Sequence, residues 1–208
     1  MIHFEKIIVR VWPEALSLQL NESEAADSNA LRLLADRAAP SRSEAIRDWL
    51  QAYQVFQGID GASRLAIASK VLEWADSRDP NRNLSTVDAI IAAHAELAQV
   101  CIQAYGEPRD FTSLASKALW LCYPDYVPIF DSFVRRALWV ISKLELNIAP
   151  PCDMEVDEYR RFVYVWKALY DRYAATLNDL DVGAYPYRVR IFDKILWLMG
   201  EPRYGFRF

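Results

Sequence analysis

Residues 87–105 read VDAIIAAHAELAQVCIQAY, and this stretch decides the fold class. Its apolar side chains recur three and four residues apart, so on an α-helix they form one stripe along one face. Ser85 is a suitable cap for the start of this helix, and Gly106 followed by Pro108 ends it. His94 lies on the stripe, where we expect a core histidine with one hydrogen-bond partner. The stretch therefore predicts a long amphipathic helix with one buried face.

The same helical period recurs along most of the chain. A second long helix is predicted over Tyr159–Leu177. Further helices are predicted from Ser41-Arg42-Ser43-Glu44, which reads as a capping box, and from Asp60-Gly61. Residues 2–12 include the β-prone run Ile7–Trp12 and are expected to form a short strand or a helix start. The fold prediction is all-α with about eight helices. They would form a single domain over residues 1–208, or two lobes with the candidate site between them.

The composition excludes several classes of protein. Six glycines in 208 residues, none of them clustered, leave no dinucleotide or triphosphate loop and no nucleophile elbow. Three widely spaced cysteines and two histidines fit no disulfide scaffold, zinc site or iron–sulfur cluster. No metal and no organic cofactor is therefore expected. The net charge of −4 argues against a surface that binds nucleic acid everywhere, but it is compatible with a local basic patch.

The sequence also carries expectations about compartment. No basic, apolar and small-residue signal pattern opens the chain, and no apolar run approaches the roughly 20 residues of a membrane span. The odd, scattered cysteines suit a reducing compartment. We therefore expect a cytoplasmic protein with no membrane partner, and the sequence does not indicate an oligomeric state.

Residues 111–138, FTSLASKALWLCYPDYVPIFDSFVRRAL, are the stretch that carries chemistry. Lys117 is expected in the first turn or so of an apolar helix. There the positive helix N-terminus and the apolar neighbours both favour the neutral, nucleophilic amine. Asp131 follows Pro-Ile-Phe, whose apolar side chains can shield it, and it also suits the N-cap of the next helix. In a purely structural interpretation Lys117 extends to solvent and Asp131 only caps.

These residues resemble the helix-hairpin-helix superfamily of DNA glycosylases. More closely, Ser-Lys-Ala-Leu-Trp followed by Pro-Ile-Phe-Asp-Ser-Phe-Val-Arg-Arg-Ala-Leu is similar to the bacterial 8-oxoguanine DNA glycosylase-like proteins. The resemblance implies a helix-hairpin-helix bundle in which Lys117 attacks C1′ of the damaged nucleotide and Asp131 stabilises the cationic transition state. Ser113 and Ala115 stand at the two glycine places of the hairpin pattern G-x-G-x-K. The resemblance therefore implies DNA contacts from arginines and from the hydroxyls of Ser113 and Ser116.

Other residues near this stretch and at the chain's basic end complete the candidate site. The expected base-stacking pocket has aromatic walls made by Trp120, Phe133 and Trp139. The expected phosphate contacts come from two basic clusters. The first, directly after Asp131, consists of Arg135 and Arg136. The second lies near the C-terminus, is interleaved with aromatic residues, and consists of Arg188, Arg190 and Lys194. Core packing for the rings, and docking of the C-terminal helix on the core, are the structural alternatives.

Three functions follow from these features. The first is a DNA base-excision protein that extrudes a modified base into an aromatic pocket and acts through Lys117 and Asp131. The second is a non-catalytic module that binds nucleic acid with a salt-dependent affinity. The third is an all-α protein-interaction or regulatory factor with an exposed aromatic patch.

Overall fold

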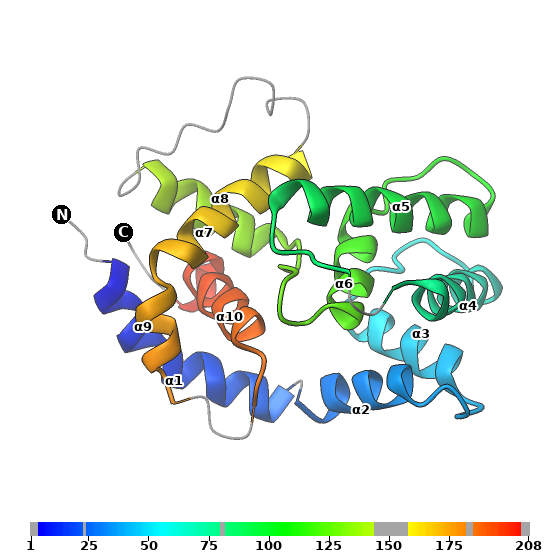
Figure 1. Cartoon of the computed structure of the whole chain (residues 1–208), viewed down its shortest axis with the longest axis horizontal. Helices are drawn as coiled ribbons and strands as arrows, with labels where there is room; N and C mark the ends of the chain where they lie inside the picture. Colours follow the sequence, from blue (N-terminus) through cyan, green and yellow to red (C-terminus); the bar gives the residue numbers. More distant parts are fainter. Residues whose placement is uncertain (1–3, 23, 80–81, 144–157, 182–184, 205–208) are drawn as a thin grey trace. The chain divides into compact units, whose positions relative to one another are not determined.

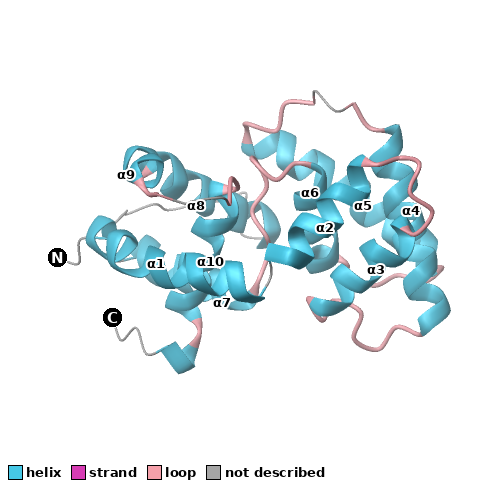
Figure 2. Cartoon of the chain, turned by 90° about the horizontal axis from the view of Figure 1, so that it is seen from below, coloured by secondary structure: helices cyan, strands magenta, loops and turns pink. Residues whose placement is uncertain are grey.

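The computed structural model describes residues 4–22, 24–79, 82–143, 158–181 and 185–204. Over these residues the protein is all-α, with ten α-helices and no strand (Figures 1 and 2). The all-α prediction is confirmed, and the helices are somewhat more numerous than the expected eight. The chain forms two compact units: unit 1 consists of residues 1–22 and 128–208, and unit 2 of residues 23–127.

Unit 1 is built around one central helix. Its helices are α1 (Phe4–Glu22), α7 (Ser132–Ile141), α8 (Glu158–Arg172), α9 (Ala174–Asp179) and α10 (Arg188–Gly200), followed by a 3-10 turn at Pro202–Tyr204. Figure 1 shows α10 in the middle of this unit, where it packs mainly against α7 and α1. Nearly all of its side chains are buried, including the polar Arg190, Asp193 and Lys194. The C-terminal helix is therefore the core of unit 1 and has no exposed face.

The N-terminal segment is helical, so of the two expected alternatives, a short strand or a helix start, the helix is the one that forms. Phe4, Ile8, Val11 and Ala15 are all buried, and their spacing places them on one face of α1. Tertiary burial of this stripe outweighs the β-propensity of the run Ile7–Trp12. The helix also contains Pro13, whose side chain lies on the exposed face.

Unit 2 consists of α2 (Glu24–Ala35), α3 (Arg42–Ala52), α4 (Gly61–Ser77), α5 (Val87–Tyr105) and α6 (Thr112–Cys122). The predicted long helix is α5, and Gly106 ends it in the left-handed conformation, φ 88°. Its N-cap is Thr86, whose Oγ1 accepts from the Ala89 N–H at 3.2 Å, and not the expected Ser85. Asp60 caps α4 by accepting from the N–H groups of Ala62 and Ser63.

Two local predictions are wrong. Ser41 makes no side-chain cap bond at the start of α3, so there is no capping box. The neighbouring Arg42 is buried instead, donates to the Leu33 and Leu34 carbonyls at the end of α2, and pairs with Asp76 at 2.7 Å. The helix predicted over 159–177 is broken at Tyr173, whose ring packs edge-on against Phe4 with centroids 5.1 Å apart.

One glycine sets how closely α10 approaches α7. A Cβ atom on Gly200 would lie 1.9 Å from the Phe133 carbonyl oxygen, which is backbone and cannot move aside cheaply. We predict that Gly200→Ala lowers the free energy of unfolding of the protein by about 3 kcal/mol. Gly61→Ala is the matched control, because a Cβ there meets nothing within 4 Å and alanine reduces the entropy of the unfolded chain. Urea denaturation followed by tryptophan fluorescence measures both, and equal stabilities would contradict the close approach.

Candidate functional site

Lys117 lies in the middle of α6 and not in its first turn, because the helix begins five residues earlier, at Thr112. Its side chain is buried, with 3% of the residue exposed. The start of the helix is held by His94 of α5, whose Nε2 lies 3.0 Å from the Thr112 carbonyl oxygen. His94 thus has the core role expected of it. The N-terminus of α6 is therefore too far along the helix to act on the Lys117 amine as expected, whereas the expected burial of Lys117 in an apolar helix is present.

Two side chains of unit 2 place the Lys117 ammonium. Its Nζ donates to the Ser113 Oγ one turn earlier, at 2.8 Å, and lies 5.8 Å from the centre of the ring of Tyr53, which directly follows α3. The Ser116 hydroxyl donates to the Ser113 carbonyl oxygen at 2.9 Å and is fully buried. Ser113 and Ser116 therefore organise the surroundings of Lys117 from inside α6. Ser116 is not on the surface where a phosphate would bind.

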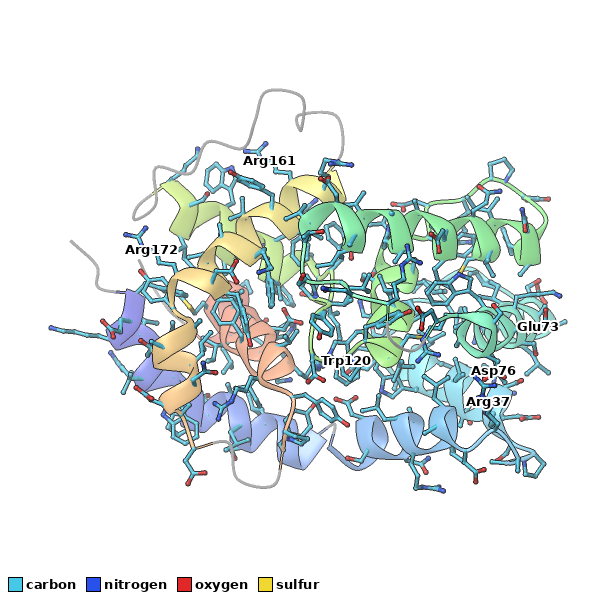
Figure 3. All side chains as sticks on the ribbon, in the orientation of Figure 1. Arg37, Glu73, Asp76, Trp120, Arg161 and Arg172 are labelled. Carbon is cyan, nitrogen blue, oxygen red and sulfur yellow. The ribbon has the colours of Figure 1, made fainter. Side chains whose placement is uncertain are left out.

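A buried carboxylate that sequence reasoning missed is hydrogen-bonded to Tyr53, the residue whose ring lies next to the Lys117 ammonium. Asp27 of α2 is fully buried, and its Oδ1 accepts from Trp49 Nε1 at 2.8 Å and from the Tyr53 hydroxyl at 3.2 Å. The Trp120 ring stacks on Trp49 with centroids 5.8 Å apart and planes 10° from parallel. Trp120 is fully buried, so it is a core residue rather than an open pocket wall (Figure 3). No local pattern marks Asp27, since its partners are distant in sequence.

Asp131 in unit 1 is the N-cap of α7, as the sequence predicted. Its Oδ1 accepts from the Phe133 N–H at 2.8 Å, and the side chain is half-buried. The chain leading to it is anchored by Asp193 of α10, which accepts from the Ile129 N–H at 2.9 Å and from Trp166 Nε1 at 2.7 Å. The position of Asp131 is therefore fixed from both sides, by its own helix and by α10.

Burial controls the protonation of Asp193. The side chain is fully buried, and loss of hydration raises its pKa from the ordinary 3.8 to about 7. The two hydrogen bonds and the nearby Arg190 guanidinium act against this shift, and the Asp131 carboxylate adds to it. Asp131 and Asp193 thus lie near each other in unit 1. Asp131 is half-buried at the N-terminus of α7, and Asp193 is fully buried.

The basic residues of α10 are largely used within unit 1. Arg188 donates to the Leu177 and Leu180 carbonyl oxygens at the end of α9. Arg190 is buried, and so is Lys194, whose ammonium lies 4.7 Å from the centre of the Trp197 ring. These three residues do not form the exposed strip of cations that the sequence suggested. The periodic pattern could not reveal this, since it shows polar positions but not how many neighbours surround a helix.

An open groove lies between α7 and α8. Its volume is about 640 Å³. Polar and apolar side chains both line it: Ser132, Arg135, Arg136, Ser142, Glu158 and Arg161, and Leu138, Trp139, Phe162 and Val165. Three of the residues predicted for the site, Arg135, Arg136 and Trp139, meet here. Phe133 lies on the same helix, but its ring packs against Trp197, with centroids 5.6 Å apart. Arg161 of α8 is a member that sequence reasoning missed.

The predicted catalytic pair is divided between the two units. Lys117 belongs to unit 2, with Asp27, Tyr53 and Ser113 around it, and Asp131 belongs to unit 1. Each residue is held firmly within its own unit, and their cooperation remains a prediction.

Neither described cysteine suits a nucleophilic role, and the described residues include no cluster able to hold a metal ion. Burial raises the pKa of both Cys101 and Cys122 to about 12, so neither is a thiolate near neutral pH. Cys152 lies outside the described residues.

Comparisons with protein-family models, with curated proteins and with solved structures find no match. One described helix, α5, has the length and mean hydropathy, 1.2, of a membrane span by composition alone. Ile90, Ile91, Leu97 and Cys101 of that helix are buried, and it packs against α4 and α6.

The raised pKa of Asp193 predicts a pH-dependent stability. Because the folded chain binds this proton more tightly than the unfolded chain, the contribution of Asp193 to the free energy of unfolding falls as the pH rises from about 4 to about 7. Above about pH 7 this contribution does not fall any further. Asp193→Asn removes the titration but retains only one acceptor oxygen, which adds a pH-independent cost of about 1–3 kcal/mol.

The measurement is urea denaturation of both proteins at several pH values. The difference in free energy of unfolding between the wild type and Asp193→Asn should decrease across this window. A constant difference would show that Asp193 does not titrate there. Comparing the two proteins cancels the carboxylates whose pKa is lowered, such as Asp76 and Glu96.

Proposed function

We propose that the chain is a DNA base-excision protein of the glycosylase-like type, with Lys117 as the amine nucleophile and Asp131 as the stabilising carboxylate. The observation that carries the proposal is the setting of Lys117, a buried lysine in an apolar helix whose amine is fixed by Ser113 and by the Tyr53 ring. Lysine is rarely buried, because desolvation of its charge is costly. A buried, oriented amine is the arrangement that nucleophilic catalysis requires.

The proposed reaction balances with these two residues and water. The neutral amine of Lys117 bonds to C1′ of the sugar while the glycosidic bond breaks, and its electron pair leaves with the base, which takes up a proton. The C1′–O4′ bond then opens as the nitrogen loses its remaining protons and forms an imine, and O4′ becomes a hydroxyl. A carboxylate at Asp131 would stabilise the positive charge that develops on the sugar.

Trapping of the imine tests the role of Lys117. Wild-type protein incubated with a duplex that contains oxidised guanine and with borohydride should give a covalent protein–DNA adduct. Lys117→Arg should abolish the adduct, because the guanidinium keeps the positive charge and the reach toward Ser113 but cannot form the imine. Lys70→Arg is the control, since Lys70 is exposed and pairs with Glu73 at 2.6 Å. An adduct that persists in Lys117→Arg would show that Lys117 is not the nucleophile. No adduct with wild-type protein across a panel of lesions would refute the proposed enzymatic activity.

Asp131→Asn separates catalysis from capping. Asparagine caps helices as well as aspartate does, so α7 and the stability of the protein should be retained. The rate of adduct formation should fall on the order of 10²-fold, because the negative charge is lost. Asp60→Asn makes the same change at the N-cap of α4 and should leave the rate unchanged. An equal fall in both variants, or no fall in Asp131→Asn, would contradict a catalytic carboxylate.

A non-catalytic nucleic-acid-binding protein is the second candidate, and the arginine groove of α7 and α8 favours it. The residues of that groove all belong to unit 1, so a binding function there requires nothing of Lys117. Salt-dependent binding that is unchanged in Lys117→Arg, together with no base release by the wild type, would select this alternative.

A further inference from the structure

We propose that the groove between α7 and α8 binds single-stranded DNA, with phosphates on its arginines and an unpaired base on Trp139. It would hold the strand on which the proposed excision acts, and in that respect it rests on the proposed function. The observation behind it is independent, however, because it concerns only the geometry and charge of one groove in unit 1. Its test involves binding and no excision.

The charge of the groove differs in sign from that of the chain. Among the described residues that line it, Arg135, Arg136 and Arg161 are basic and Glu158 alone is acidic, although the chain carries a net charge of −4. Glu158 is already paired with Arg135. Arg136 donates to the Gly200 carbonyl oxygen at 3.3 Å, which holds its guanidinium near the end of α10. The groove therefore presents a local excess of positive charge, which favours an anionic partner.

Arg161 is the cation most available to a ligand. It is exposed on α8, and within the part of the chain that the structure describes it makes no hydrogen bond or ion pair. Figure 3 shows its side chain projecting outward from the helix. A guanidinium with all of its donors available can bind a phosphate through two parallel hydrogen bonds.

Trp139 distinguishes a nucleic acid from other anionic partners. Just over half of this residue is exposed, at 52%, which is unusual for so large an apolar side chain. The Lys143 ammonium lies over this ring, 3.6 Å from its centre, and so covers one of its two faces. A base can stack on the other face while a phosphate pairs with the cation. The carboxylates of an acidic peptide would gain nothing from the ring, because the face of an aromatic ring is electronegative.

The size of the groove and the exposure of the ring indicate a single strand. A volume of about 640 Å³ lies in the range of sites that bind small organic ligands, and it can accommodate a nucleotide. In an intact duplex the bases are stacked on one another, so Trp139 can stack only on a base that is unpaired or extruded.

The test is fluorescence anisotropy with a labelled oligothymidylate at low salt, using the full-length protein. The wild type should bind, and its affinity should fall as salt is added. Arg161→Glu should weaken binding by about tenfold or more and make the salt dependence shallower. Trp139→Ala should also weaken binding by about tenfold, through lost stacking.

Arg172→Glu is the matched control. Arg172 is exposed near the other end of α8, roughly 16 Å from Arg161 by helix rise, and it does not line the groove (Figure 3). Arg172→Glu changes the net charge by the same amount as Arg161→Glu. Because Arg172 lies outside the groove, this variant should leave the affinity nearly unchanged. Equal weakening by both variants would show that net charge alone governs binding and would overturn the site. Circular dichroism of each variant verifies that α8 remains folded.

Three further outcomes overturn the proposal. They are absence of binding by the wild type at low salt, equally tight binding of a polyglutamate peptide at the same groove, and a dimer in sedimentation that Arg161→Glu dissociates. The last two would identify an acidic protein or a second copy of the chain as the occupant. Oligonucleotide binding by the wild type that Arg161→Glu weakens, together with no imine trapping by the wild type, would refute the Lys117 chemistry alone. Imine trapping by the wild type, together with oligonucleotide binding that Arg161→Glu leaves unchanged, would refute the groove alone.

Discussion

A buried aspartate that accepts a hydrogen bond from a tryptophan indole organises each unit of this protein. In unit 1 the bond joins Asp193 and Trp166, at 2.7 Å, and in unit 2 it joins Asp27 and Trp49, at 2.8 Å. Burying a carboxylate is costly unless donors replace its lost water, and both residues have a second donor. For Asp193 this donor is the Ile129 N–H, and for Asp27 it is the Tyr53 hydroxyl. These bonds fix the geometry of their surroundings more strictly than apolar contacts would, because a misplaced donor leaves a buried charge unsatisfied.

Both residues singled out for chemistry lie next to one of these aspartates. Asp193 anchors the backbone two residues before Asp131, and Asp27 holds the Tyr53 ring over which the Lys117 ammonium lies. The surroundings of Lys117 and Asp131 are thus ordered by groups that do not themselves face solvent. In a preorganised site, reactive side chains are held in position by supporting residues of this kind.

The sequence predicted those parts of the fold that depend on local pattern. The stripe of α5, its stop at Gly106, the helix start at Asp60-Gly61 and the cap Asp131 each follow from residues close together in the chain. What it missed depends on distant partners. Asp27 meets Trp49 across 22 positions and Asp193 meets Ile129 across 64, and no local window contains both members of either pair. For the same reason Arg190 and Lys194 looked like an exposed basic face, although α10 is enclosed on all sides.

The arginines differ from these buried carboxylates in that some of them bind helix ends and others are exposed. This difference distinguishes arginines with a structural contact from those available to a ligand. Arg42 and Arg188 donate to carbonyl oxygens at the ends of α2 and α9, so their charge satisfies backbone groups that the helices leave unpaired. Within the described residues Arg161 makes no such bond; it is exposed and lines the same groove as the exposed Trp139. An exposed arginine that supports no helix end contributes little to stability, since surface charges are well hydrated. Its charge is therefore available to a ligand of the groove that it lines.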